Sequence, residues 1–234
     1  MILICAATLM ELDACLSPIH FHFEEFPPGA GKPWVRTKGR LAFAVTGVGI
    51  PMTLAKLLPL ATMLKPELIL NAGIAGAYPG SGLAIGDVVA GLSELFGDLG
   101  METPEADGFL PLSGFAWADE EYRRPLDLAL EPLGLGGRTT GESEGSIRIA
   151  RGCTVNACAG REETGGRRRA LTGADFETME GAAAALVGRE LGIPVCEVRA
   201  ISNIASARDM RRENIDAALG NLGVYIGPWL GRNA

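Results

Sequence analysis

The sequence predicts an α/β fold in which one sheet is covered by helices on both faces. Short apolar runs such as residues 2–7 and 41–49 have the continuous hydrophobicity of strands that are buried on both sides. Segments with helical character alternate with these runs, an order typical of such a sheet. The chain has 234 residues, 47% of them hydrophobic, so it can bury roughly three quarters of its unfolded surface in one core. We therefore expect a single domain over residues 1–234.

The first half of the chain alternates strands with helices. In order, we expect a strand at 2–7, a helix through Cys15, a turn at 27–33, a strand at 41–49, a helix from Pro51 to Leu64, a strand at 67–76 and a further apolar segment at 84–91. The strands at 41–49 and 67–76 both run into glycines, which mark turns, and proline is favoured in the first turn of a helix.

The second half begins with an irregular stretch at 96–118, which is rich in glycine, proline and acidic residues. Long loops of this kind often form lids or contacts between subunits. We then expect a helix at 119–131, a strand at 146–158 interrupted at Gly152, a helix at 178–191 capped by Gly192, a strand from Pro194 that runs out into a loop near Asn203, and a last helix at 213–230.

Composition excludes several classes of partner. The net charge of -7 argues against nucleic acids and anionic membranes, because both attract a basic surface. The triplet Arg167–Arg169 is the only basic cluster, and we expect it to be solvated helix surface. No apolar run approaches the ~20 residues of a membrane helix, and the apolar start lacks a basic n-region. Five cysteines without CxxC spacing suit reduced thiols, so we expect a soluble, cytoplasmic protein.

Common cofactor and metal motifs are missing. The sequence contains no GxSxG, no GxxxxGK[ST] and no GxGxxG after its first strand. His20 and His22 are the only histidines, and no third ligand lies nearby. We therefore expect neither a cofactor nor a metal site.

Polar residues gather where the predicted strands end. Glu11 follows the first strand, the glycines of residues 73–76 end another, Glu180 begins a helix and Asn203 leaves the last strand. Such strand ends are where α/β folds place their sites. Glu11 could act as a general base, although acids in the first turn of a helix also interact favourably with its dipole. Glu180 leaves the same two interpretations open.

Taken together, five motifs resemble the nucleoside phosphorylase and nucleosidase superfamily, whose members cleave N-glycosidic bonds of nucleosides. In chain order they are ILICAATLMEL, TGVG, NAGIAGA with IGDVV, ETMEGAA and VRAISN. The resemblance covers most of the chain and implies a three-layer sandwich with a central mixed, twisted sheet, usually in a homo-oligomer. Within the superfamily the sequence most resembles the futalosine hydrolase family, which removes hypoxanthine from futalosine in a menaquinone pathway.

The resemblance also implies roles for seven residues. Glu11 matches the acid that activates the attacking water, Arg199 matches an arginine near that water, and Asn203 matches the residue that faces N7 of the purine. Met179 and Glu180 match the pair that holds the ribose, and Ala75 and Gly76 belong to the loop beneath the sugar. Two departures matter. Ile74 stands where the sibling nucleosidases for methylthioadenosine carry a serine, and residues 155–162 lack the aromatic that stacks on the base.

The amide of Asn203 points to a 6-oxopurine. Adenine presents an N7 acceptor beside a 6-amino donor, whereas hypoxanthine presents acceptors at N7 and O6. An Asn amide can donate to these acceptors, and a mismatched buried polar pair costs ~1 to 3 kcal/mol. We therefore expect hydrolysis of futalosine. The alternatives are a methylthioadenosine/adenosylhomocysteine or aminofutalosine nucleosidase, a 6-oxopurine nucleoside phosphorylase, in which Glu11 would repel the phosphate, and a binding protein without turnover.

Overall fold

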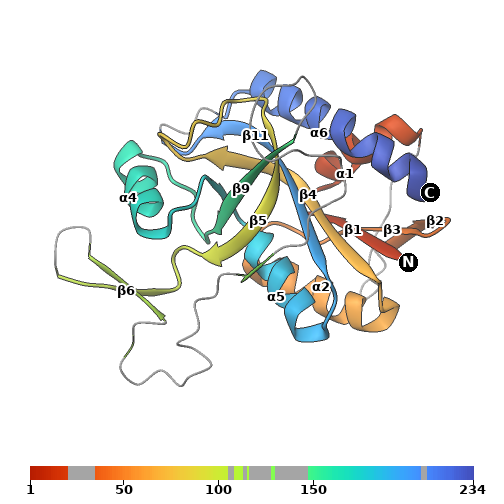
Figure 1. Ribbon diagram of the computed structural model, residues 1–234, viewed down its shortest axis with the longest axis horizontal. Helices are drawn as coiled ribbons and strands as arrows, with labels where there is room; N and C mark the ends of the chain where they lie inside the picture. Colours follow the sequence, from red (N-terminus) through yellow and green to blue (C-terminus); the bar gives the residue numbers. More distant parts are fainter. Residues whose placement is uncertain (21–34, 105–107, 113–114, 116–127, 130–146, 207–209) are drawn as a thin grey trace.

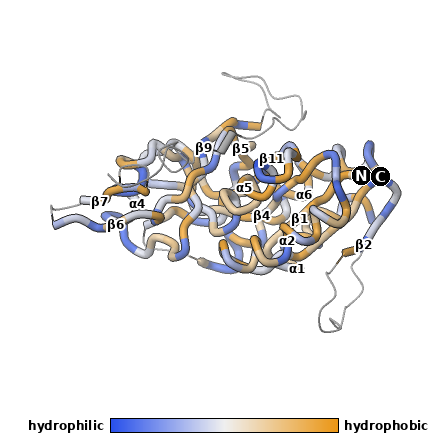
Figure 2. The backbone as a smooth tube through the Cα atoms, turned by 90° about the horizontal axis from the view of Figure 1, so that it is seen from below, coloured by the Kyte–Doolittle hydropathy of each residue, from blue (hydrophilic) through white to orange (hydrophobic). Residues whose placement is uncertain are grey.

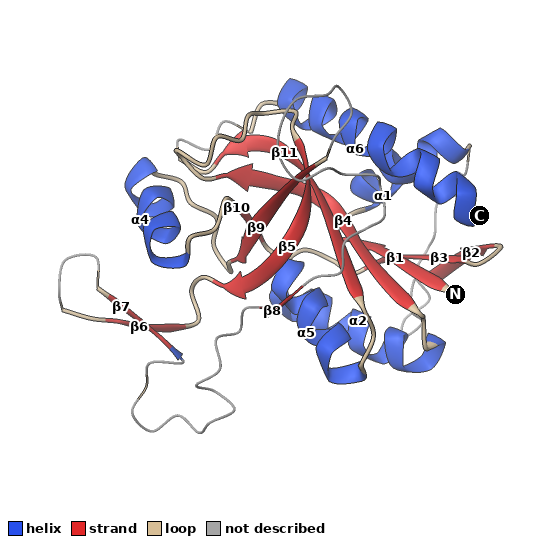
Figure 3. Cartoon of the chain, in the orientation of Figure 1, coloured by secondary structure: helices blue, strands red, loops and turns tan. Residues whose placement is uncertain are grey.

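The computed structural model describes residues 1–20, 35–104, 108–112, 115, 128–129, 147–206 and 210–234 of the chain. Within them, nine strands form one mixed sheet in the order β10-β9-β5-β11-β4-β1-β3-β2, with β8 paired to β5 (Figures 1 and 3). Their bounds are β1 Ile2–Ala6, β2 Val35–Lys38, β3 Leu41–Val45, β4 Leu68–Ala77, β5 Val88–Phe96, β8 Leu128–Ala129, β9 Arg148–Thr154, β10 Phe176–Thr178 and β11 Val195–Ile204.

Helices cover both faces of this sheet. They are α1 Leu9–Leu16, the 3₁₀ turn η1 Ser17–Ile19, α2 Ile50–Leu64, α4 Glu162–Thr172, α5 Gly181–Leu191 and α6 Arg212–Asn233. Helices α1 and α6 lie on one face, and α2 and α5 lie on the other (Figure 1). Separate hydrophobic clusters fill these two layers, and the apolar segments follow the strands in the middle of the molecule (Figure 2). The predicted three-layer α/β fold is therefore confirmed.

Five strands close into a ring at one end of the sheet. Strand β10 pairs with β9 in parallel and with β4 in antiparallel, so that β4, β11, β5, β9 and β10 are linked continuously. A third cluster of buried side chains fills the ring, with one or more residues from each of its strands: Ala75, Ala77, Val89, Ala150, Phe176 and Ile201, together with Leu83. The ring brings β10 beside the end of β4, although about a hundred residues separate them in the sequence.

Several predicted elements need correction. Strand β9 runs through Gly152 without interruption. Glycine stands there because a side chain would overlap the Glu94 carboxyl group and the Phe176 ring. The helix expected at 178–191 begins only at Gly181, because Thr178 pairs with β9 as the end of β10. The helix expected at 119–131 is wrong at Leu128 and Ala129, the two residues of this range that the structure describes. They pair with β5 as strand β8.

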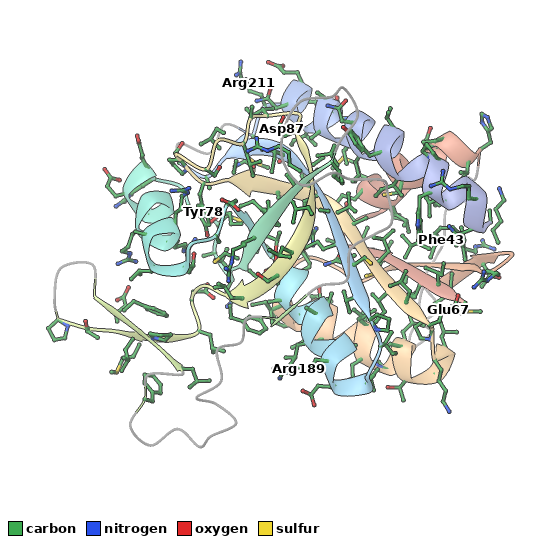
Figure 4. The ribbon with its side chains drawn as sticks, viewed as in Figure 1. Phe43, Glu67, Tyr78, Asp87, Arg189 and Arg211 are labelled. Atoms are coloured by element: carbon green, nitrogen blue, oxygen red, sulfur yellow. The ribbon has the colours of Figure 1, made fainter. Side chains whose placement is uncertain are left out.

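Other differences concern the stretch at 96–118 and the segment around Arg167–Arg169. The stretch at 96–118 contains a two-stranded sheet of β6 (Gly100–Glu102) and β7 (Phe109–Pro111), which projects from the body of the molecule (Figure 1). The triplet Arg167–Arg169 lies on a helix, α4, as expected, but its Arg168 is mostly buried rather than solvated. Tyr78 lies between α4 and the sheet (Figure 4). The turn expected at 27–33 lies outside the described residues.

Two observations concern the cysteines and the membrane segments discussed from the composition. All five cysteines are reduced, and every one except Cys158 is buried. Among the described residues, no helix combines the length and the apolarity that a membrane span requires.

Candidate active site

A cavity of about 230 Å³ opens where β1, β4, β10 and β11 end. Six of the seven predicted site residues line it, namely Glu11, Ala75, Gly76, Met179, Glu180 and Asn203. Apolar side chains add to the lining, namely Ala7, Met10, Val48, Ile74, Cys158 and Met210, and the polar residues Thr8, Glu177, Thr178 and Ser202 complete it. No aromatic residue is among the described residues that line the cavity, in agreement with the missing aromatic noted in the sequence.

Glu11 is held rigidly at one end of the cavity. It is the third residue of α1 and forms a capping box with Thr8, whose backbone N–H and hydroxyl donate to Glu11 Oε2 at 3.0 and 2.8 Å. The backbone N–H of Ile74 donates to the other oxygen, Oε1, at 3.0 Å. Glu11 is therefore both a helix-capping acid and a buried carboxylate fixed against β4. The position of Glu11 in the first turn of a helix is confirmed, and its role as a general base stays a prediction.

Glu180 lies at the N-cap of α5 and faces the same cavity beside Met179. Its Oε1 accepts a hydrogen bond from the backbone N–H of Gly49 at 2.9 Å, so the glycine turn after β3 anchors it. Burial raises the pKa of the Glu180 carboxyl, and the Arg199 guanidinium opposes this shift. Oxygen Oε2, 3.9 Å from Arg199 Nη1, has capacity left for a ligand.

Arg199 does not line the cavity but lies directly behind it. Its side chain is fully buried, and its Nε donates to Glu197 Oε1 at 2.8 Å. Burial alone would lower the pKa of Arg199, but the carboxylates of Glu197 and Glu180 outweigh this effect and raise it, so the guanidinium stays charged. A Cβ on Gly73 would lie only 2.5 Å from Arg199 Nη1 and 2.6 Å from Glu11 Oε1.

The absence of a side chain at Gly73 thus leaves room for Arg199 and Glu11 to approach each other. Neither Nη1 nor Nη2 of Arg199 has a hydrogen-bond partner among the described residues. Arg199, which was predicted to lie near the attacking water, therefore lies beneath Glu11 and Glu180. There it can orient the two carboxylates and balance their charge.

Glu94 extends the buried network behind Arg199. It is completely buried on β5, and its carboxyl group accepts hydrogen bonds from the hydroxyls of Thr154 at 2.8 Å and Thr178 at 3.3 Å. Burial and the neighbouring Glu197 carboxylate raise the pKa of Glu94 well above the ordinary value. Oxygen Oε2 of Glu197 has no hydrogen-bond partner among the described residues. The raised pKa favours a protonated Glu94 beneath the site.

Asn203 lies at the other end of the cavity. The Ser202 hydroxyl lies 3.1 Å from Asn203 Oδ1, and Nδ2 donates to the Ile204 carbonyl at 3.2 Å. These contacts orient the amide so that one N–H of Nδ2 remains for a ligand, rather than the two expected from the sequence. Asn203 is opposite Gly76 in the register of β11 with β4, two residues beyond Ile74, which contacts Glu11. Glu11 and Asn203 are thus separated along β4 by about 7 Å.

Sequence reasoning missed four polar residues in or beneath the cavity. Glu177 and Thr178 line it, and Glu94 and Glu197 lie under it. An acid within an apolar strand was a usable signal for Glu94 and Glu197, because an isolated charge is rarely buried without a partner. No group of three potential metal ligands occurs among the described residues, and His22 lies outside them.

Comparisons with known proteins place this geometry in context. The family model described as "Phosphorylase superfamily" matches residues 2–223. A futalosine hydrolase of Thermus thermophilus is 33% identical over 216 residues, which are 88% of this chain and 90% of that protein. The structure of the Helicobacter pylori 5'-methylthioadenosine/S-adenosyl homocysteine nucleosidase superposes with a TM-score of 0.76 at 18% identity, covering 99% and 97% of the two chains. The native futalosine hydrolase of H. pylori superposes with a TM-score of 0.69 at 19% identity, covering 98% and 94%.

Proposed function

The chain belongs to the phosphorylase superfamily and is an N-glycosyl hydrolase of the nucleosidase type, and we propose that its substrate is futalosine. The products would be hypoxanthine and dehypoxanthine futalosine, an intermediate of menaquinone biosynthesis. The observation that carries this proposal is the pairing of a fixed carboxylate, Glu11, with a fixed amide, Asn203, at the two ends of one cavity.

Glu11 is the proposed general base. Cleavage of the C1'–N9 bond develops positive charge on the ribose, and a water molecule attacks C1' from the face opposite the purine. The water oxygen forms the new bond to C1', its proton passes to Glu11, and the bonding electron pair leaves with N9. Three hydrogen bonds hold the Glu11 carboxylate still during this step. The reaction would invert the configuration at C1', as in inverting glycosidases.

Met179 and Glu180 are proposed to hold the ribose. Glu180 has one oxygen anchored by Gly49, so its second oxygen can accept hydrogen bonds from the sugar hydroxyls. The thioether of Met179 offers an apolar surface to the sugar, and Ala75 and Gly76 lie beneath it without bulky side chains. Arg199 is a positioning residue in this proposal, because it contacts the acids and not the cavity.

Asn203 is proposed to stabilise the departing purine. Its remaining N–H can donate to N7 or O6 of hypoxanthine, both of which gain negative charge as the bond to the ribose breaks. An amide cannot release a proton at neutral pH, so water would protonate the purine anion. An aspartate at this position would favour the 6-amino purines. The amide is therefore the reason to prefer futalosine over methylthioadenosine or aminofutalosine.

Product analysis tests the proposal. Purified protein is incubated with futalosine in phosphate-free buffer, and the products are separated by chromatography and identified by mass spectrometry. We expect hypoxanthine together with the free sugar product. An absolute requirement for phosphate, with release of a sugar phosphate, would instead establish a phosphorylase. Binding of futalosine without any base release would leave only the binding protein.

We further propose that residues 1–234 act as one domain in a cytoplasmic homo-oligomer. Strands β6 and β7 project from the body of the molecule (Figure 1), and we propose that the stretch at 96–117 to which they belong encloses the carboxyphenyl tail of futalosine in a second subunit. Light scattering after size-exclusion chromatography measures the oligomeric state, and an elution as a monomer of 24.5 kDa would contradict the proposal.

A further inference from the structure

Glu177 is a second polar group at the purine end of the cavity, and the hydrolysis mechanism leaves it without a role. It is the middle residue of β10, lines the cavity and is only 3% exposed. A buried carboxylate is unfavourable unless its environment compensates for the lost hydration. Protein groups supply part of this compensation, and the open cavity beside Glu177 offers space for a further partner.

The strand register places Glu177 and Asn203 on either side of the same glycine. In the ring of strands, Gly76 of β4 is opposite Glu177 of β10 on one side and opposite Asn203 of β11 on the other. Neighbouring strands lie about 4.8 Å apart, so the two Cα atoms are about 10 Å from each other.

The two side chains converge above Gly76. A Cβ at Gly76 would lie 3.0 Å from Asn203 Nδ2 and 3.4 Å from Glu177 Cγ. The Asn203 amide and the Glu177 side chain thus border a bare glycine floor. A flat ring that lies on this floor would meet a donor at one edge and an acceptor at the next.

The Glu177 carboxylate is fixed in place but not fully used. The backbone N–H of Ala159 donates to Oε1 at 2.8 Å, and Arg168 Nη1 donates to Oε2 at 3.2 Å. Burial raises the pKa of Glu177, and these two donors oppose that shift. A carboxylate can accept about four hydrogen bonds, so lone pairs remain available to a ligand.

Adjacent edges of a 6-oxopurine match this arrangement. N7 and O6 are acceptors and would face the donor Asn203, and the next position around the ring, N1–H, is a donor and needs an acceptor. In a 6-aminopurine N1 carries a lone pair instead, which would face the Glu177 carboxylate with no proton between them. On the basis of the proposed function, we propose that Glu177 determines specificity by accepting a hydrogen bond from N1–H of the leaving 6-oxopurine.

Affinities for the free bases test this role separately from catalysis. Calorimetric titration of the wild-type protein with hypoxanthine and with adenine gives their affinity ratio, which we expect to favour hypoxanthine. A Glu177→Gln variant keeps one acceptor oxygen, for either Ala159 or Arg168, and replaces the other oxygen with an amide donor. We expect it to lower the hypoxanthine-to-adenine ratio by about 10- to 100-fold, the size of one mismatched buried hydrogen bond.

Arg168→Gln is the matched control, because it removes the other partner of the Glu177 carboxylate and leaves the carboxylate itself. It should keep the wild-type ratio even if the protein becomes less stable. A purely structural role of Glu177 would weaken both bases by the same factor in the Glu177→Gln variant, and an unchanged ratio would overturn the proposal.

A second ligand keeps the test decisive if the Glu177→Gln variant does not fold. Hypoxanthine methylated at N1 lacks the N1–H, so the wild-type protein should bind it at least tenfold more weakly than hypoxanthine. Equal affinities would overturn the role of Glu177. Tight, selective binding of hypoxanthine without any turnover of futalosine would contradict the proposed hydrolase function and leave the role of Glu177 intact. No binding of hypoxanthine at all would overturn both.

Discussion

Replacing Glu94 by glutamine should change how the stability of the protein depends on pH. Glu94 is completely buried, and burial together with the Glu197 carboxylate raises its pKa well above the reference value of 4.5. As the pH rises above 4.5, the unfolded chain releases this proton and the folded protein keeps it. Stability is therefore lost with rising pH until the pH reaches the raised pKa of the folded state.

The size of this effect follows from proton linkage. Each pH unit in that window lowers the free energy of unfolding of the wild type by about 1.4 kcal/mol through Glu94 alone. The Glu94→Gln variant has no proton to release, and its amide can still accept from Thr154 and donate towards Glu197. Glu177 and Glu180, whose pKa values burial also raises, titrate in both proteins and cancel in the difference.

Urea denaturation at pH 5, 6 and 7 measures the difference directly. Wherever the pH lies between 4.5 and the raised pKa of Glu94, we expect the variant to gain on the wild type with rising pH, by up to about 1.4 kcal/mol per unit. Glu190→Gln makes the same chemical change at an exposed position, where water solvates the carboxylate in both states, and should follow the wild type. Parallel curves for Glu94→Gln and the wild type would refute the raised pKa of Glu94 in the folded protein.

Three further variants test the site. Glu11→Gln keeps the capping box, because glutamine can also occupy this position of the motif. It should lower kcat at least 100-fold and change nucleoside affinity only a few-fold, as measured by stopped-flow kinetics and equilibrium titration. A fully active variant would show that Glu11 is not the base. Asn203→Asp should shift preference from 6-oxo to 6-amino purines by about tenfold or more in kcat/KM, whereas an unchanged ratio would undo the interpretation of the amide. Gly73→Ala should destabilise the protein by about 1 to 3 kcal/mol and reduce kcat, because its Cβ would displace Arg199 or Glu11; wild-type stability in urea would contradict the close approach.

The features that the sequence predicted well are local. Buried strands are short apolar runs, and the turns after them carry glycine, so the ends of β1 and β4 could be located and Glu11 and Gly76 assigned to one region. The helix start at Glu11 was also readable, because a threonine three residues before an acid is the signal of a capping box.

The features that were missed depend on long-range pairing. Strand β10 has only three residues, and its pairing with β9 and β4 cannot be read from its own sequence. For that reason Thr178 was assigned to a helix, and Glu177 was not recognised as a site residue. The burial of Arg199 had a weak signal, since Glu197 lies two residues earlier in the same strand and therefore shares its face.

The most direct test of the account is a comparison of futalosine with aminofutalosine, which differ only at the 6-position of the purine. Initial rates of base release in phosphate-free buffer give kcat/KM for each substrate with the wild-type protein. The account predicts that futalosine is preferred at least tenfold, because Asn203 offers a donor where a 6-amino group needs an acceptor. Equal rates, or a preference for aminofutalosine, would contradict it.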